Sequence, residues 1–260
     1  MAWRQIGTAA RDLVAGRPGV FATNPDSGDV HRYTGEGTTW QRIGGPGARF
    51  ATTNSALFGL SPNRGAVYRW TGTGTEWQQV GGGAESLVGG GAGLIATSPA
   101  TGDVYRYSGE GDRWEKIGGP GAAFAVGGRI VGLSPDRRAV TQWERGTEWR
   151  RIGGPSSSVI AGTGGIYATR PDTGDVGAWS GPDEWVRYGG PGYAFAAAHT
   201  LYGISPDRQA IWRWLGNEQW EEVGGPAEAI AVWQEETVDH LYAIRPGDRS
   251  VWYERLTTLT

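Results

Sequence analysis

The sequence contains no cysteine, which excludes disulfide bonds, thiol catalysis and cysteine-based zinc sites. Its 260 residues include only 3 histidines, and neither a G-x-S-x-G nor an H-E-x-x-H motif is present. No apolar stretch approaches the roughly 18 residues that a membrane span requires. These absences predict a protein that is not an enzyme, holds no metal or cofactor and does not insert into a membrane.

Basic patches are lacking as well. The net charge is -3, and the chain carries no basic run and no RNP-like or zinc motif, so we expect no nucleic-acid partner. The opening residues, Met-Ala-Trp-Arg-Gln-Ile-Gly, do not form the charged and then apolar segments of a signal peptide. Two interpretations stay open: the protein remains in the producing cell, or a leader has been removed from a secreted domain.

Glycine and tryptophan are abundant, at 46 and 14 residues, and half of the tryptophans recur at spacings of 37, 37, 37, 35, 36 and 35. Each of these opens a W-x-x-[IVY]-G segment, and five segments continue as G-G-P. A sequence pattern that recurs every 35–37 residues indicates a repeat architecture. The opening residues of the seven repeats are Trp3, Trp40, Trp77, Trp114, Trp149, Trp185 and Trp220.

Each repeat holds four short runs rich in β-branched and aromatic residues, separated by Gly, Pro, Asp and Ser. No window shows the 3.6-residue period of a helix. Four strands in a repeat of this length form one blade of a β-propeller. The sequence therefore predicts an all-β fold over residues 1–260, a single seven-bladed propeller with four antiparallel strands per blade.

The order of the runs predicts how the ring closes. The chain begins on the tryptophan strand, which is the fourth strand of a blade, and the last repeat ends on its third strand, Val251–Glu254. We expect residues 3–6 to supply the missing outer strand, so that the last blade comprises residues 227–256 and 2–7. An open array would instead leave unpaired strand edges. The opening tryptophans are expected to pack between neighbouring blades.

The repeated phrase W-x-x-I-G-G, followed by L-Y-G-x-S-P-D and V-Y-R-W, resembles the tectonin repeat and the wider tachylectin-2-like propeller lectins. The resemblance covers essentially the whole chain, although many tectonin-type rings have six blades rather than seven. It implies a lectin-like protein that binds glycans without catalysis.

A second aromatic series, at the end of the third strand, is the candidate sugar-binding platform, because aromatic rings stack on sugars while polar neighbours bind hydroxyls. Packing at the outer part of the blade is the alternative interpretation, and Glu254 replaces the aromatic residue in the last repeat. The series comprises Tyr33, Trp70, Tyr107, Trp143, Trp179 and Trp214. The candidate polar partners are Arg69, Arg106, Arg213, Asp136 and Asp207. The Asp residues also suit a purely structural role in turns.

The leading hypothesis is a multivalent lectin with several equivalent, weak glycan sites between blades. A protein-interaction scaffold is the main alternative; it predicts one distinctive patch, for which the insert Trp233–His240 of the last repeat is the candidate. An accessory module of a longer secreted enzyme and an engineered propeller without assigned activity are the others. The sequence specifies neither the sugar nor the oligomeric state.

Overall fold

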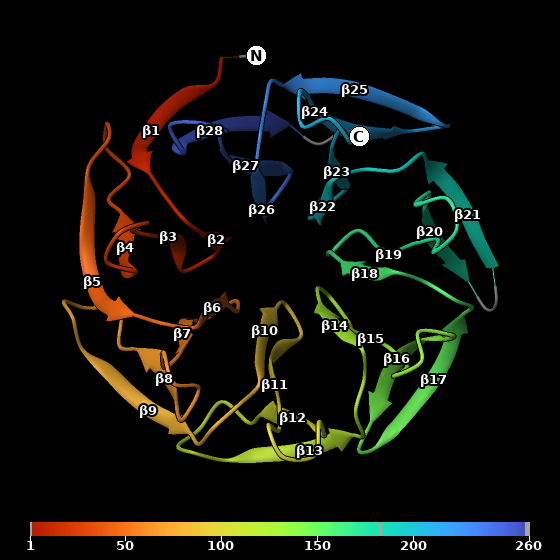
Figure 1. Cartoon of the computed structure of the whole chain (residues 1–260), viewed down its shortest axis with the longest axis horizontal. Helices are drawn as coiled ribbons and strands as arrows, with labels where there is room; N and C mark the ends of the chain where they lie inside the picture. The colour runs from red at the N-terminus through yellow and green to blue at the C-terminus, as the bar shows by residue number, and fades with distance from the viewer. Residues whose placement is uncertain (1, 182–183, 258–260) are drawn as a thin grey trace.

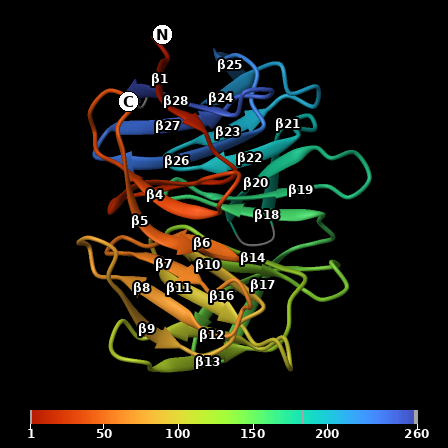
Figure 2. The ribbon, with the colours of Figure 1, turned by 60° about the vertical axis from the view of Figure 1, so that its left-hand side comes forward.

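The computed structural model describes residues 2–181 and 184–257, and these form seven four-stranded antiparallel sheets around a central axis (Figure 1). This confirms the predicted fold class. In the oblique view of Figure 2, the innermost strands of successive blades follow one another around the axis. The short β-branched and aromatic runs form the strands, and the Gly, Pro and Asp clusters form the turns between them.

Six blades are continuous in sequence and the seventh combines both ends of the chain. Blades 1 to 3 comprise β2 (Leu13–Gly16), β3 (Gly19–Thr23), β4 (Asp29–Tyr33) and β5 (Trp40–Pro46); β6 (Arg49–Thr52), β7 (Leu57–Leu60), β8 (Val67–Trp70) and β9 (Trp77–Gly81); β10 (Ser86–Gly90), β11 (Gly93–Thr97), β12 (Val104–Tyr107) and β13 (Trp114–Gly118). Blades 4 to 6 comprise β14 (Ala123–Val126), β15 (Ile130–Leu133), β16 (Val140–Arg145) and β17 (Glu148–Gly153); β18 (Ser158–Ala161), β19 (Ile166–Thr169), β20 (Val176–Gly181) and β21 (Glu184–Gly189); β22 (Ala194–Ala197), β23 (Leu201–Ile204), β24 (Ile211–Gly216) and β25 (Gln219–Gly224). Blade 7 comprises β26 (Ala229–Glu235), β27 (Val238–Ile244), β28 (Ser250–Thr257) and β1 (Arg4–Ala9).

The ring closes as the sequence predicts. Strand β1 pairs antiparallel with β28, with Arg4 opposite Tyr253 and Gln5 opposite Trp252. In Figure 1 the N-terminal strand accordingly lies outside β28. The pairing completes the four strands of blade 7, so that neither β1 nor the outer side of β28 is left without a partner strand.

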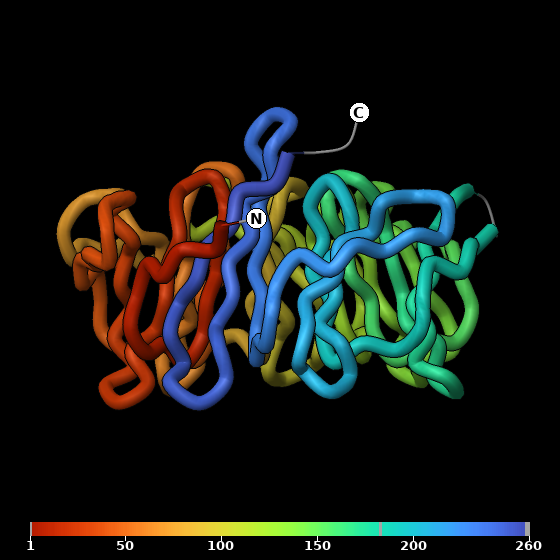
Figure 3. The backbone as a smooth tube through the Cα atoms, turned by 90° about the horizontal axis from the view of Figure 1, so that it is seen from above, coloured from red at the N-terminus to blue at the C-terminus, as the bar shows by residue number. Residues whose placement is uncertain are grey.

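The meander of each blade gives the disc two different faces. The loops between second and third strands and the G-G-P segments lie on one face, which we call the turn face. The loops between first and second strands and between third and fourth strands lie on the other, the hairpin face. Seen edge-on, the disc carries one hairpin that rises well beyond the others, that of β26 and β27 (Figure 3).

The core lies between neighbouring blades rather than within one of them. One cluster, for example, packs Val30 and Ile43 of blade 1 against Leu57 and Trp70 of blade 2. Because every blade is covered on both sides, its strands have apolar residues on both faces.

The opening tryptophans join consecutive blades by the same hydrogen bond at all seven positions. Each indole Nε1 donates to a backbone oxygen of the preceding blade's outer strand, at the residue just before the glycine of W-x-x-[IVY]-G. The N···O distances are 2.5–2.9 Å. The pairs are Trp3 with Val223, Trp40 with Ile6, Trp77 with Ile43, Trp114 with Val80, Trp149 with Ile117, Trp185 with Ile152 and Trp220 with Tyr188. This confirms the predicted packing role of the tryptophans.

The glycine of the same segment makes the joint possible. A Cβ atom at Gly118 would lie 2.5 Å from Nε1 of Trp149, far inside contact distance. At the next glycine, Gly119, an added Cβ atom would have no neighbour within 4 Å and would face open space. The first glycine is therefore required by packing and the second is not.

We predict that Gly118→Ala lowers the free energy of unfolding by about 1–3 kcal/mol, because the added methyl group overpacks the joint with Trp149. Gly119→Ala is the matched control and should change stability by less than about 0.5 kcal/mol. Urea unfolding followed by tryptophan fluorescence measures both. Equal stability of the two variants would contradict the role assigned to the joint.

Candidate functional sites

The predicted aromatic series lies between blades near the hairpin face. Three of its rings are buried: Trp70, Tyr107 and Trp214 are 7%, 7% and 8% exposed. Two of these three rings donate a hydrogen bond to a nearby turn. Nε1 of Trp70 donates to the carbonyl oxygen of Gly74, and the hydroxyl of Tyr107 donates to the carbonyl oxygen of Gly111. Tyr33 and Trp143 make the same kind of bond to Gly37 and Gly146.

Of the predicted arginines, Arg106 faces the aromatic series across the blade boundary. Arg213 instead donates to the carboxylate of Glu221 and to the backbone oxygen of Thr257. Two arginines outside the predicted set, in blade 4, make the same kind of contact as Arg106. Arg106 lies 5.5 Å from the ring centroid of Trp143 in the next blade, and Arg129 and Arg150 each lie 5.6 Å from Trp179. Such cation–π contacts add to the stability of the joints. The positive charge of Arg69 acts to lower the pKa of Tyr107, although burial of the phenol outweighs it and raises that pKa.

The predicted aspartates stand on the opposite face of the disc. Asp136 accepts hydrogen bonds from Ser134 and from the backbone N–H of Arg138, and these bonds hold the pKa of Asp136 below its usual value. Asp207 binds Ser205 and the backbone of Gln209 in the same way. The third strand separates these turns from the aromatic series, so the expectation that the two lie side by side was wrong.

A groove that the sequence did not reveal recurs at the outer part of the turn face. In blade 1 it is lined by Gly7–Ala9 of the preceding outer strand, the end of β3, His31 and Trp40. In blade 6 it is lined by Gly189–Pro191, the end of β23, Trp212 and Trp220, which are the corresponding positions. We call these the rim grooves; their volumes are about 230 and 190 Å³.

Both rim grooves contain a residue of the third strand that lies two positions before the predicted aromatic series. In every blade this residue pairs with a residue of the second strand. It is partly exposed in all seven blades. The seven residues are His31, Tyr68, Tyr105, Thr141, Gly177, Trp212 and Trp252. Within the described residues, the hydroxyls of Tyr68 and Tyr105 and the indole N–H of Trp212 have no hydrogen-bond partner, so they are available to a ligand.

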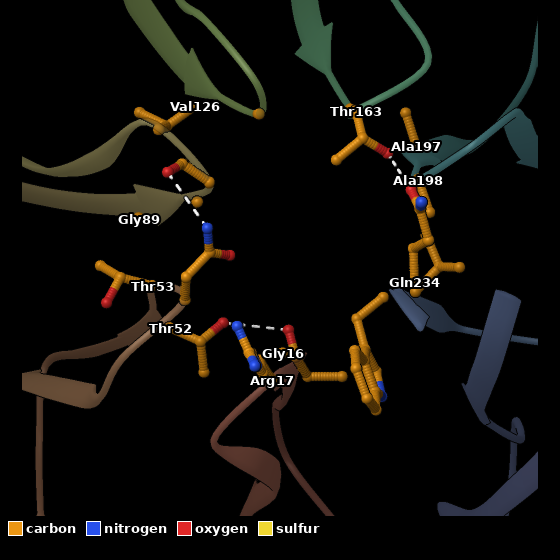
Figure 4. Close-up of a pocket in the computed structure, with 18 of the residues that line it drawn as sticks. Gly16, Arg17, Thr52, Thr53, Gly89, Val126, Thr163, Ala197, Ala198 and Gln234 are labelled. Atoms are coloured by element: carbon orange, nitrogen blue, oxygen red, sulfur yellow. Dashed lines mark hydrogen bonds between the residues drawn. The ribbon is translucent and has the colours of Figure 1, made fainter. Parts of the chain in front are cut away.

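The hairpin face carries a cavity of about 480 Å³ on the axis, lined by the turns between first and second strands of all seven blades (Figure 4). Most of its lining residues are small, and backbone bonds such as Ala92 N–H to Gly127 O, at 2.7 Å, join successive turns. Blade 7 differs, because its long hairpin brings Trp233, Gln234 and two glutamates to the wall. Figure 4 shows Gln234 facing Thr163 of blade 5, and the two side chains are hydrogen bonded.

A buried polar chain supports this hairpin at the boundary between blades 6 and 7. Asp239 is 1% exposed and accepts from the hydroxyl of Tyr202 at 2.8 Å and from the backbone N–H of His199 at 3.4 Å. Nε2 of His199 lies 3.1 Å from Nε2 of Gln234, and its Nδ1 lies 3.7 Å from Asp239. Burial raises the pKa of Asp239, whereas the hydroxyl of Tyr202 acts to lower it. The fold thus gives His199 a carboxylate neighbour that the sequence spacing did not reveal.

We predict that Tyr202→Phe lowers the free energy of unfolding at neutral pH by about 1–3 kcal/mol, because the Asp239 carboxylate loses a buried donor. The pKa of Asp239 should rise further, so the deficit should shrink as the pH falls through that pKa and the carboxyl becomes protonated. Tyr167→Phe, at the corresponding position of blade 5, is the control, since the Tyr167 hydroxyl has no hydrogen-bond partner within the described residues. Denaturant titrations at several pH values measure the free energy of unfolding of each variant. A loss of stability in Tyr202→Phe that does not change with pH would count against this assignment.

Two other features are absent from the described part of the chain. No group of three or more His, Cys, Asp or Glu residues there is arranged to hold a metal ion. Nor does that part contain a helix of the length and hydropathy needed to cross a membrane.

The fold defines the protein as a seven-bladed β-propeller, but sequence comparison assigns no family. No protein-family model matches the chain, and no curated protein matches it. The resemblance to tectonin-type lectins therefore stays a prediction.

Solved structures similar to this chain share its fold over nearly the whole length. A streptogramin B lyase gives a TM-score of 0.70 at 9% identity, covering 99% of this chain and 98% of its own. A catalytically inactive virginiamycin B lyase from Staphylococcus aureus, solved with quinupristin, gives 0.66 at 13% identity and 99% coverage of both chains. The WD40 propeller domain of Doa1 gives 0.65 at 12% identity, covering 98% and 97%. At these identities the likeness shows the fold alone, and the neighbours include both enzymes and a WD40 domain.

Proposed function

We propose that this protein is a non-catalytic, multivalent carbohydrate-binding protein whose sites are the rim grooves. The observation that carries the proposal is the recurrence of the groove in blades 1 and 6, built from the same positions of the repeat. A lectin that uses several related sites requires such a recurrence, whereas a scaffold with a single partner does not.

The chemistry of the rim grooves supports a sugar ligand. An aromatic ring such as Trp212 offers an apolar face to the C–H groups of a sugar, and its free N–H can donate to a hydroxyl. The two volumes lie below the range of about 300–1,000 Å³ typical of sites for drug-sized ligands, which suits a single sugar ring. Each site would bind weakly, and avidity on a glycan-coated surface would supply useful affinity.

The site therefore differs from the one expected from the sequence. Trp70, Tyr107 and Trp214 are buried at the blade boundaries, whereas the series that contains His31 and Trp212 is partly exposed. We assign the stacking role to this second series and a joint-forming role to the first.

A glycan array followed by calorimetry with the selected monosaccharide tests the proposal. We expect more than one site per chain, and we expect Trp212→Ala to lower the measured stoichiometry while leaving the remaining sites unchanged. Thr141→Ala, at the corresponding position of blade 4 where no aromatic residue stands, is the control and should leave the stoichiometry unaltered. Absence of binding to every glycan class by the folded protein would refute the proposal.

One observation favours a second candidate function, a protein-interaction scaffold. The hairpin of β26 and β27 rises beyond the disc beside the axial cavity, and the other six blades have no counterpart of it among the described residues (Figure 3). It coincides with the Trp233–His240 insert named as the scaffold candidate from the sequence. Shortening this hairpin should leave glycan binding in the rim grooves intact, so the two functions can be separated.

A further inference from the structure

One position near the axis of the turn face breaks the symmetry of the ring. The position lies at the start of the first strand of each blade, or directly before it in blade 1, and it faces the last residue of the second strand. Blade 2 alone has a basic residue at this position. The seven residues are Asp12, Arg49, Ser86, Ala123, Ser158, Ala194 and Ala229.

Arg49 lines a cavity of about 500 Å³ that lies over blades 2 to 4. The volume falls within the range of small-molecule sites. The cavity differs from the rim grooves in position and in lining, and it lies on the face opposite the axial cavity.

The charges of this cavity are not balanced. Its other arginine, Arg64, forms an ion pair with its one carboxylate, Glu85. Arg49 is exposed, and within the described residues it has neither a hydrogen bond nor an ion pair. In the neighbouring blade the carboxylate of Asp12 is bound by Arg11 at 2.8 Å and by the hydroxyl of Thr23 at 3.2 Å. The guanidinium of Arg49 is therefore the unpaired charge, and a carboxylate is the group whose geometry it matches best.

Hydroxyl and apolar groups complete the lining. The hydroxyl oxygen of Ser98 accepts from the backbone N–H groups of Ala100 and Thr101, both at 3.3 Å, which leaves its own O–H free to donate. Ser86 and Thr97 add two further hydroxyls, 2.8 Å apart. The ring of Phe124 contributes an aromatic wall. This set matches a small molecule that has a carboxylate, several hydroxyls and one apolar face.

We propose that this cavity is a single binding site for a saccharide carboxylate, such as a hexuronate, with Arg49 binding the carboxylate and Ser98 a hydroxyl. The site does not rest on the rim grooves. A cavity at the corresponding positions of blades 7, 1 and 2 also includes Arg49, but there the carboxylate of Asp12 stands where Ser86 stands in this one. The cavity over blades 2 to 4 therefore has the cation of Arg49 without a second carboxylate beside it.

Calorimetric titration of the full chain with glucuronate, glucose and inorganic phosphate tests the assignment. We expect glucuronate to bind with one site per chain, more weakly as salt is added, and glucose to bind at least tenfold more weakly at that site. Arg49→Gln should raise the dissociation constant for glucuronate by about tenfold or more, and Arg49→Lys by less. Ser98→Ala should weaken binding without changing its dependence on salt.

Two control variants separate this site from the others. Arg17→Gln removes an exposed arginine that lines the axial cavity, and Trp212→Ala alters a rim groove. Neither should affect the binding of glucuronate. The assignment is overturned if wild-type protein does not bind glucuronate, if Arg49→Gln binds it equally well, if Trp212→Ala abolishes it, or if phosphate binds as tightly through Arg49.

Discussion

The hydrogen bond from each opening tryptophan to the outer strand of the preceding blade is the constraint on which the structure depends. It fixes the distance between neighbouring sheets, because a glycine beneath the indole allows the ring to approach the backbone to 2.5–2.9 Å. The apolar clusters between blades then fill the space that this joint defines. The bond from Trp3 to Val223 closes the ring with the same geometry, so the closing joint is equivalent to the other six.

Much of this architecture could be predicted from the sequence, because it rests on periodic signals. The spacing of the tryptophans gives the number of blades, and the order of the strand runs identifies the strand that completes blade 7. The long hairpin of the last repeat is likewise visible as an insert. These features need no knowledge of distant contacts, since each repeat carries the same local pattern.

The position of the site could not be predicted in the same way. Tyr68 and Trp70 are both aromatic and, two residues apart, project from the same side of β8. Only the register shows that Trp70 lies opposite Trp77, where its ring is covered, whereas Tyr68 lies opposite Gln79 near the open rim. The role of Arg49 could not be predicted for a related reason. Nothing in its own repeat marks it as unusual, and whether its guanidinium has an ion-pair partner depends on side chains from three blades.

The repeated joint also bears on how such a ring can change in evolution. The turn between neighbouring sheets is set by one indole, one glycine and one carbonyl group, and this angle is added seven times to make a full circle. Duplicating or deleting a repeat would copy or remove a complete joint, but every remaining angle would then have to change. The angle at each joint therefore determines the number of blades. Loops and grooves can diverge in sequence without changing that angle.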